Sequence, residues 1–132
     1  MRRQFNLPEG DEAYLASLNL PCETIIENNQ RWVVIHDFPL PKGYDQIKAS
    51  MAVKIESCYP DVQLDMVYFF PHLSRSDQKS IGALSSFNLD GKNWQRWSRH
   101  RTSKNPWRPG IDDLASHILL IQYWLEREFR KA

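Results

Sequence analysis

A serine and a histidine that could take part in nucleophilic chemistry lie two residues apart in one unusual stretch of the chain. Ser98 and His100 fall within residues 92–108, which also hold three of the five tryptophans, six lysines and arginines, and no carboxylate. Residues two apart in an extended segment lie on the same face, and a hydroxyl beside an imidazole is a common pair in nucleophilic catalysis. Residues 92–108 are therefore the candidate reactive segment.

The same stretch must also be anchored to a core. Tryptophan side chains are large and usually buried, whereas arginine side chains need water or anions. We therefore expect Trp94, Trp97 and Trp107 to be core anchors, with Trp107 buried beside the last helix. The basic side chains should form a rim around them.

The composition is that of a soluble globular protein, and residues 1–132 are expected to form one domain. Apolar residues make up 42% of the chain and charged residues 25%, which suffices for one substantial core. The net charge of +1 argues against nucleic-acid or membrane binding through the whole surface. No apolar run is long enough to cross a bilayer and no signal peptide is recognisable, so the expected location is the cytoplasm.

The cysteines and the remaining histidines give no indication of a metal site. Cys22 and Cys58 lack the spacing of metal ligands, and both are expected to be reduced, small and buried. His36, His72 and His117 are expected to be structural residues with hydrogen-bond partners. No metal or cofactor is expected.

Hydrophobic periodicity predicts a short helix followed by four strands. Acidic residues in the first turn favour a helix at residues 11–18. Alternating or apolar runs predict strands at residues 22–27, 31–38, 47–55 and 64–70. Asn28-Asn29 is a turn signal between the first two strands, because asparagine tolerates positive φ. Residues 72–93 have weak periodicity and are expected to be mostly loop.

The last third of the chain predicts an irregular segment and a long helix. Pro106 and Pro109 disfavour a helix at the end of residues 92–108. Apolar residues then follow helical spacing over residues 111–129, with aspartates at the start and basic residues at the end. The expected fold class is α+β: an N-terminal helix, a four-stranded antiparallel meander, an irregular active-site segment and a long C-terminal helix. One face of the sheet should pack on that helix, and the other should be wet.

Several local motifs resemble the ubiquitin-conjugating (UBC) fold. Tyr59-Pro60 follows the third predicted strand, as in that fold, and Trp107-Arg108-Pro109 precedes the long helix. More specific strings resemble family E of the prokaryotic UBC-like proteins: LPKGY, YPD…LDM…F and WQRWSRH…WRPG.DDL. The resemblance covers nearly the whole chain and implies a UBC-like fold.

The resemblance also implies a function in bacterial ubiquitin-like conjugation. Such proteins are transferases that work beside a ubiquitin-like protein and a ThiF-like activating enzyme. A JAB-type metallopeptidase is often encoded in the same operon, and these operons are linked to antiphage defence. None of these partners is indicated by composition or spacing.

The sequence departs from the UBC pattern at the expected nucleophile. In that fold the thioester cysteine lies about eight residues before the conserved tryptophan. Counting back from Trp107 reaches Ser98 and Arg99, and no cysteine is near. The His-Pro-Asn motif of the fold is also missing, because Phe-Pro-His-Leu occupies roughly its place at residues 70–73.

Two interpretations follow from this departure. In the first, Ser98 carries the ubiquitin-like protein as an oxyester, with His100 as its general base. Arg99, Arg96 and Arg101 then stabilise an oxyanion or attract the carboxyl terminus of the acyl donor. In the second, catalysis is lost and the protein is an inactive interaction scaffold in the same pathway.

Simpler roles remain open for the candidate residues. Ser98 can be an ordinary exposed or capping serine, and His100 can be a surface histidine. Ser85-Ser86 is a rival nucleophile site, although a loop serine pair is the simpler interpretation.

A third function is a single-stranded nucleic-acid-binding module. Bases would stack on Trp94 and Trp97 while the basic residues contact phosphates. Because the basic cluster is short and the net charge is small, nucleic acid is the least favoured partner.

Overall fold

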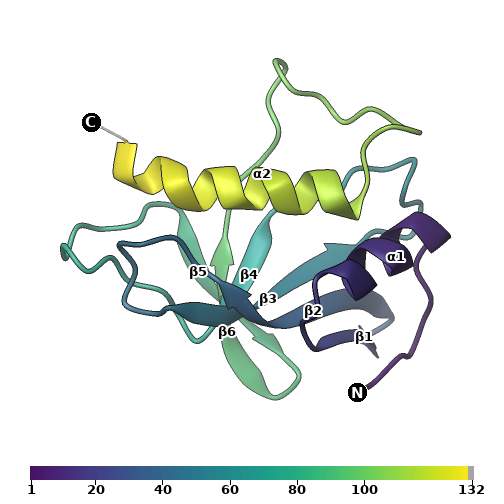
Figure 1. The fold of residues 1–132 in the computed structure, drawn as a ribbon, viewed down its shortest axis with the longest axis horizontal. Helices are drawn as coiled ribbons and strands as arrows, with labels where there is room; N and C mark the ends of the chain where they lie inside the picture. The colour runs from purple at the N-terminus through teal and green to yellow at the C-terminus, as the bar shows by residue number, and fades with distance from the viewer. Residues whose placement is uncertain (131–132) are drawn as a thin grey trace.

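A long helix covers one face of a curved antiparallel sheet in the computed structural model (Figure 1). The structure describes residues 1–130. The elements in chain order are α1 (Glu9–Ser17), β1 (Cys22–Glu27), β2 (Gln30–Pro39), β3 (Lys48–Ile55), β4 (Val67–Phe70), β5 (Leu84–Leu89), β6 (Lys92–Trp97), α2 (Leu114–Arg127) and the 3₁₀ turn η1 (Glu128–Arg130).

The predicted meander is confirmed. β1 to β4 pair antiparallel with their sequence neighbours, and each predicted strand overlaps an observed one. The β1–β2 hairpin turns at Asn28 and Asn29, whose φ angles are 52° and 60°. Two successive residues with positive φ match the twist of the flanking strands. The turn predicted from Asn28-Asn29 is therefore confirmed.

The prediction of four strands is wrong, because the described residues form a six-stranded sheet in the order β1-β2-β3-β4-β6-β5. β5 lies in the region expected to be loop, and β6 forms the first part of the segment expected to be irregular. The hairpin between them turns at Asp90 and Gly91, with φ angles of 55° and 71°. Asp-Gly is a strong hairpin signal. Two serines and one asparagine obscured the strand signal of β5, which lies at the edge of the sheet and can carry polar residues.

β6 is an inner strand, which explains why its tryptophans are buried. It lies between β4 and β5, and Trp97 pairs with Val67 on one side and Leu84 on the other. Successive side chains of a strand point to opposite faces. Trp97 therefore joins the core under α2, and Trp94 joins a second cluster on the other face of the sheet.

The apolar stripe of α2 packs on the sheet, as predicted. Ile118, Ile121 and Leu125 are fully buried against residues of β2, β3, β4 and β6. The helix begins three residues later than expected, because Asp113 is its N-cap and forms a reciprocal capping box with Ser116. Ile111 lies outside the helix and is 64% exposed.

The opposite face of the sheet is not simply wet, which corrects the expectation from the alternation in β3. The sheet curves so that β1 approaches the β5–β6 turn (Figure 1). This curvature buries a second cluster on the concave side: Ile25, Trp32, Val34, Ala52, Tyr68, Leu89 and Trp94.

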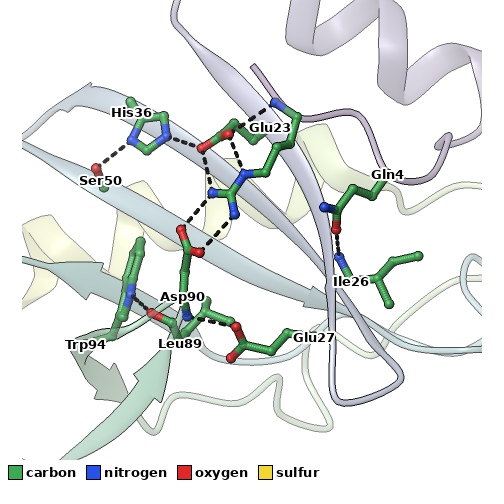
Figure 2. Close-up of polar contacts among 10 residues, drawn as sticks. Gln4, Glu23, Ile26, Glu27, His36, Ser50, Leu89, Asp90 and Trp94 are labelled. Carbon is green, nitrogen blue, oxygen red and sulfur yellow. Dashed lines mark hydrogen bonds and ion pairs between the residues drawn. The ribbon is translucent and has the colours of Figure 1, made fainter.

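An ion-pair network joins the two ends of the curved sheet. The Arg2 guanidinium lies 3.0 Å from Glu23 on β1 and 2.7 Å from Asp90 in the β5–β6 turn. His36 bonds Glu23 at 2.8 Å and Ser50 at 2.9 Å, so it is a structural histidine as predicted (Figure 2). The hydrogen bonds from Arg2, together with that of His36, lower the pKa of Glu23 to about 2.

We expect Glu23→Gln to lower the free energy of unfolding at pH 7 by about 1–2 kcal/mol. The folded-state pKa of Glu23 lies below its ordinary value of 4.5. The stabilisation is therefore present above that value and is lost as the pH falls towards 2. Urea unfolding of both proteins at pH 7 and pH 3 should show a difference that narrows in acid. Glu9→Gln, an exposed change in α1, serves as the control. A difference that is equal at both pH values would assign the loss to packing.

Candidate functional site

The segment of residues 98–113 connects β6 to α2. In Figure 1 it is the green connection that rises beyond α2 and returns to its first turn. The Met66 N–H donates to the Arg99 carbonyl at 3.2 Å, and the Trp107 indole donates to the Pro60 carbonyl at 2.9 Å. The β3–β4 connection thus holds this segment at two points.

The start of α2 is also held by the β3–β4 connection. The Tyr59 hydroxyl donates to the buried Asp11 carboxylate, which also accepts from the Leu114 N–H at 3.3 Å. Burial raises the pKa of Asp11. Within α2, the buried His117 bonds the Met66 carbonyl at 2.9 Å, and burial lowers its pKa to about 4. His117 is therefore neutral and structural at pH 7, as predicted.

Ser98 follows directly after β6 and presents an uncommitted hydroxyl. Its backbone N–H donates to the Ala83 carbonyl at 3.0 Å, which continues the pairing of the β5–β6 hairpin. The residue is half-buried. Within residues 1–130 its Oγ makes no hydrogen bond. The main chain of Ser98 is therefore held by the hairpin, whereas its hydroxyl has no hydrogen-bond partner among the described residues and is available to react or to bind.

His100 is oriented by a carboxylate that the sequence did not indicate. Its Nδ1 lies 3.0 and 2.9 Å from the two carboxylate oxygens of Asp65. Because a carboxylate oxygen accepts, Nδ1 is the donor of this pair, and Nε2 is the ring nitrogen left for another contact. The His100 side chain is 59% exposed. A histidine held by a carboxylate is the arrangement of a general base.

The structure does not join Ser98 to His100. No hydrogen bond links the two side chains, although they lie on the same short segment. Asp65 could have been noticed as the acidic residue just before β4, but no spacing rule relates it to position 100. Asp65 lies close to His100 because β4 pairs with β6.

Arg99 is turned into the fold rather than towards a reaction centre. Its guanidinium lies 3.3 Å from Glu128 and stacks over the Trp97 ring at 4.9 Å. The Arg99 side chain is only 12% exposed. This placement counts against the predicted role of Arg99 at an oxyanion, because its charge is already balanced by a buried carboxylate.

Arg101 is also committed to holding the segment together. It donates to the Asn105 carbonyl at 3.2 Å, lies 3.7 Å from Asp112 and stacks over Trp107 at 5.1 Å. Burial would raise the pKa of Asp112, but the Arg108 N–H and the nearby arginines hold it below its ordinary value. Asp112 is thus the ionised centre of the turn that precedes α2, and the predicted binding role of Arg101 loses its support.

The tryptophans are core anchors, as predicted for Trp94 and Trp97. Both indoles are buried, and their N–H groups donate to the Leu89 carbonyl and the Gln95 side chain at 3.0 and 2.9 Å. Neither has a face available for a nucleobase, so their predicted binding role is not supported. Trp107 is half-buried beside Tyr59, with ring centroids 6.1 Å apart, rather than buried beside α2.

Arg96 is the arginine of the predicted set that stays free of carboxylates within residues 1–130. Its Nε donates to Ser85 Oγ at 2.9 Å. This bond occupies Ser85 and disfavours it as a rival nucleophile. Arg96 faces the concave side of the sheet, beside Tyr68.

Neither cysteine lies in the segment of residues 98–113. Cys58 is exposed on the β3–β4 connection, which corrects the expectation that it is buried. Cys22 is half-buried at the start of β1, and burial raises the pKa of its thiol. Residues 1–130 contain no cluster of three histidine, cysteine or carboxylate side chains placed to hold a metal.

An N-terminal helix, an antiparallel sheet and a long C-terminal helix that follows a connecting segment define the UBC-like class of folds. The family model for prokaryotic E2 family E matches residues 7–128, and the chain belongs to this family. Comparison with curated proteins and with solved structures gave no significant match. No helix in the described part of the chain is long and apolar enough to span a membrane.

Proposed function

We propose that this protein is an acyl carrier of ubiquitin-like conjugation that forms an oxyester on Ser98. It would accept a ubiquitin-like protein from a ThiF-like activating enzyme and pass it to an acceptor. The main support for the proposal is that His100, two residues after Ser98, is bonded to the carboxylate of Asp65. Membership of an E2 family supports the reaction class.

The proposed loading step transfers one acyl group and one proton. Ser98 Oγ attacks the activated carboxyl-terminal carbonyl of the ubiquitin-like protein, and a new C–O bond forms. The bond from that carbonyl to the leaving group of the activating enzyme breaks. The hydroxyl proton moves to His100 Nε2 and then to the leaving group. Transfer requires His100 Nε2 to come within hydrogen-bond distance of Ser98 Oγ while Nδ1 stays bonded to Asp65. Catalytic hydrogen bonds often tighten only when the substrate binds.

Discharge would reverse these roles. The amine of the acceptor attacks the ester carbonyl, the C–O bond to Ser98 breaks, and the proton returns to Oγ. A JAB-type metallopeptidase of the same operon would be a further partner, and the reaction would take place in the cytoplasm of a bacterium, in a pathway linked to antiphage defence.

A second candidate function is an inactive scaffold in the same pathway. Among residues 1–130 the Ser98 hydroxyl has no base within hydrogen-bond distance, and Arg99 and Arg101 form ion pairs with Glu128 and Asp112. These observations favour a protein that binds its partners without forming a covalent adduct.

Mass spectrometry of a reconstituted reaction separates the two functions. The protein is incubated with the cognate activating enzyme, the ubiquitin-like protein and ATP, and the adduct is mapped to a residue. The carrier function predicts an ester on Ser98 that survives reducing agent and is cleaved by hydroxylamine. Cys58→Ser should load normally, which controls for the exposed thiol. Conjugation that requires the protein but never yields an adduct would establish the scaffold.

We expect His100→Ala to slow loading of Ser98 by about 10²–10⁴-fold, the usual contribution of a general base. Asp65→Asn should lower the loading rate about tenfold, because it removes one charge-assisted hydrogen bond that orients the His100 ring. Single-turnover loading rates measure both effects. His72→Ala is the matched control, because His72 is exposed and bonds Asn93 away from Ser98. Full-rate loading by His100→Ala would remove the imidazole from the mechanism.

A further inference from the structure

A cavity of about 250 Å³ opens on the concave face of the sheet beside the candidate site. Three aromatic side chains form its floor: Trp32 lies 5.0 Å from Tyr68 and 5.4 Å from Phe87, measured between ring centroids. The charged side chains of its lining come from β3 (Lys54), from the β3–β4 connection (Glu56 and Asp65) and from β6 (Arg96). The cavity therefore combines apolar faces with polar groups, as ligand sites do.

The charges on the walls leave one cation without a carboxylate. Lys54 lies 3.8 Å from Glu56, and Asp65 is bonded to His100. The Arg96 guanidinium bonds the hydroxyl of Ser85 and also interacts with the hydroxyl of Tyr68, and no carboxylate of residues 1–130 pairs with it. A half-buried guanidinium favours a planar anion that accepts two parallel N–H bonds, which is the geometry of a carboxylate.

One hydrogen bond and one short sequence spacing connect this cavity to the candidate reaction site. Asp65 lines the cavity and also orients His100. Arg96 lies two residues before Ser98, and such residues are roughly 7 Å apart in an extended chain. A peptide anchored at Arg96 can therefore reach the Ser98 hydroxyl with about two further residues in extended conformation.

We infer that this cavity is a carboxylate-binding subsite, in which Arg96 binds a carboxylate of the incoming peptide and the aromatic floor packs on its aliphatic part. The carboxylate can belong to an acidic side chain shortly before the reacting end, in which case that end reaches Ser98. It can also be a free carboxyl terminus, in which case the peptide binds without being placed for transfer. The placement of this peptide for transfer rests on the proposed function of Ser98, whereas the binding of a carboxylate does not.

Titration of the purified protein with three short peptides tests the subsite. N-acetyl-Glu-Gly-Gly amide carries a side-chain carboxylate, N-acetyl-Gln-Gly-Gly acid carries a terminal one, and N-acetyl-Gln-Gly-Gly amide carries neither. We expect at least one acidic peptide to bind at least tenfold more tightly than the neutral peptide. Calorimetry gives the affinity, and the NMR signal of the Trp32 indole N–H reports occupancy. The acidic peptide that binds more tightly identifies the source of the carboxylate.

Arg96→Gln should lower the affinity for the acidic peptide by about 10- to 100-fold, which is the contribution of a charge-assisted pair. Arg96→Lys should retain part of the affinity, because it keeps the charge and loses the second bond. Arg127→Gln, an exposed change on α2, is the control and should bind normally. Equal affinity for acidic and neutral peptides would overturn the inference, as would full affinity in a folded Arg96→Gln. If Arg96→Gln does not fold, the peptide comparison on the wild type still decides.

The peptide titration and the loading reaction test the subsite and the proposed function independently. The titration contains no activating enzyme, so failure of Ser98 to load leaves a carboxylate subsite intact. A failed titration, in turn, leaves Ser98 loading to be decided by the mass of the adduct.

Discussion

Alanine in place of Ser98 is expected to abolish the covalent adduct with the ubiquitin-like protein while the fold stays intact. The loss is complete because the substitution removes the oxygen that would form the ester. The fold should be preserved because Ser98 Oγ makes no hydrogen bond within residues 1–130 and the backbone pairing with Ala83 is unchanged. Such substitutions usually change stability by less than about 0.5 kcal/mol. Intact-mass analysis of the loading reaction, with thermal unfolding beside it, measures both effects.

Ser98→Cys is the informative companion variant. A thiol is more nucleophilic than a hydroxyl near neutral pH, so loading should continue or accelerate. The adduct should now be a thioester that excess thiol removes, whereas the wild-type ester resists thiol and is cleaved by strong base or hydroxylamine. An adduct that forms at the full rate on Ser98→Ala would exclude Ser98 as the carrier. Absence of any adduct on the wild type, with conjugation still dependent on the protein, would favour the scaffold.

Trp97→Ala should cost about 3–5 kcal/mol of unfolding free energy, the usual range for removing a large aromatic side chain from a core. Trp97 is 0% exposed and lies under α2, edge-on to Phe69 with ring centroids 5.4 Å apart. It also supports the Arg99 guanidinium, which holds residues 98–113 to Glu128. The substitution should therefore loosen the candidate site as well as the core. Urea unfolding gives the free energy.

Trp107→Ala provides the matched comparison for Trp97→Ala. Trp107 is half-buried, and its contacts are Tyr59, Arg101 and the Pro60 carbonyl. The lost burial is smaller, so the expected cost is about 1–3 kcal/mol. Equal losses for the two variants would show that Trp97 is not the main anchor of this region.

Arg96 differs from the other arginines near Ser98 in having no carboxylate partner among residues 1–130. Two of the arginines near Ser98, Arg99 and Arg101, already have carboxylate partners in the fold. In the subsite that we infer, electrostatic attraction of an incoming carboxylate near Ser98 would therefore come from Arg96, which faces the concave cavity. Because that cavity shares Asp65 with His100, occupation of the subsite and orientation of the imidazole can be coupled through one carboxylate.

The sequence by itself determined the elements whose signals are local. The asparagine pair at residues 28–29 fixed the first hairpin, alternation located β3, and helical spacing located the apolar stripe of α2. These signals depend on backbone preferences and on burial of one face, both of which are written in neighbouring residues. The strings around residues 94–114 also indicated the family that the family model identified.

Only the tertiary structure decided which charged groups meet. The pairing of β6 with β4 brings Asp65 to His100, although 35 residues separate them in the chain. The same packing places Glu128 against Arg99 and leaves Arg96 without a carboxylate among the described residues. The sequence records that each arginine is charged, but a charge can be neutralised by a carboxylate anywhere in the chain. Which arginine remains available to a ligand is therefore a property of the folded packing, because ion pairing depends on distance in space rather than on separation along the chain.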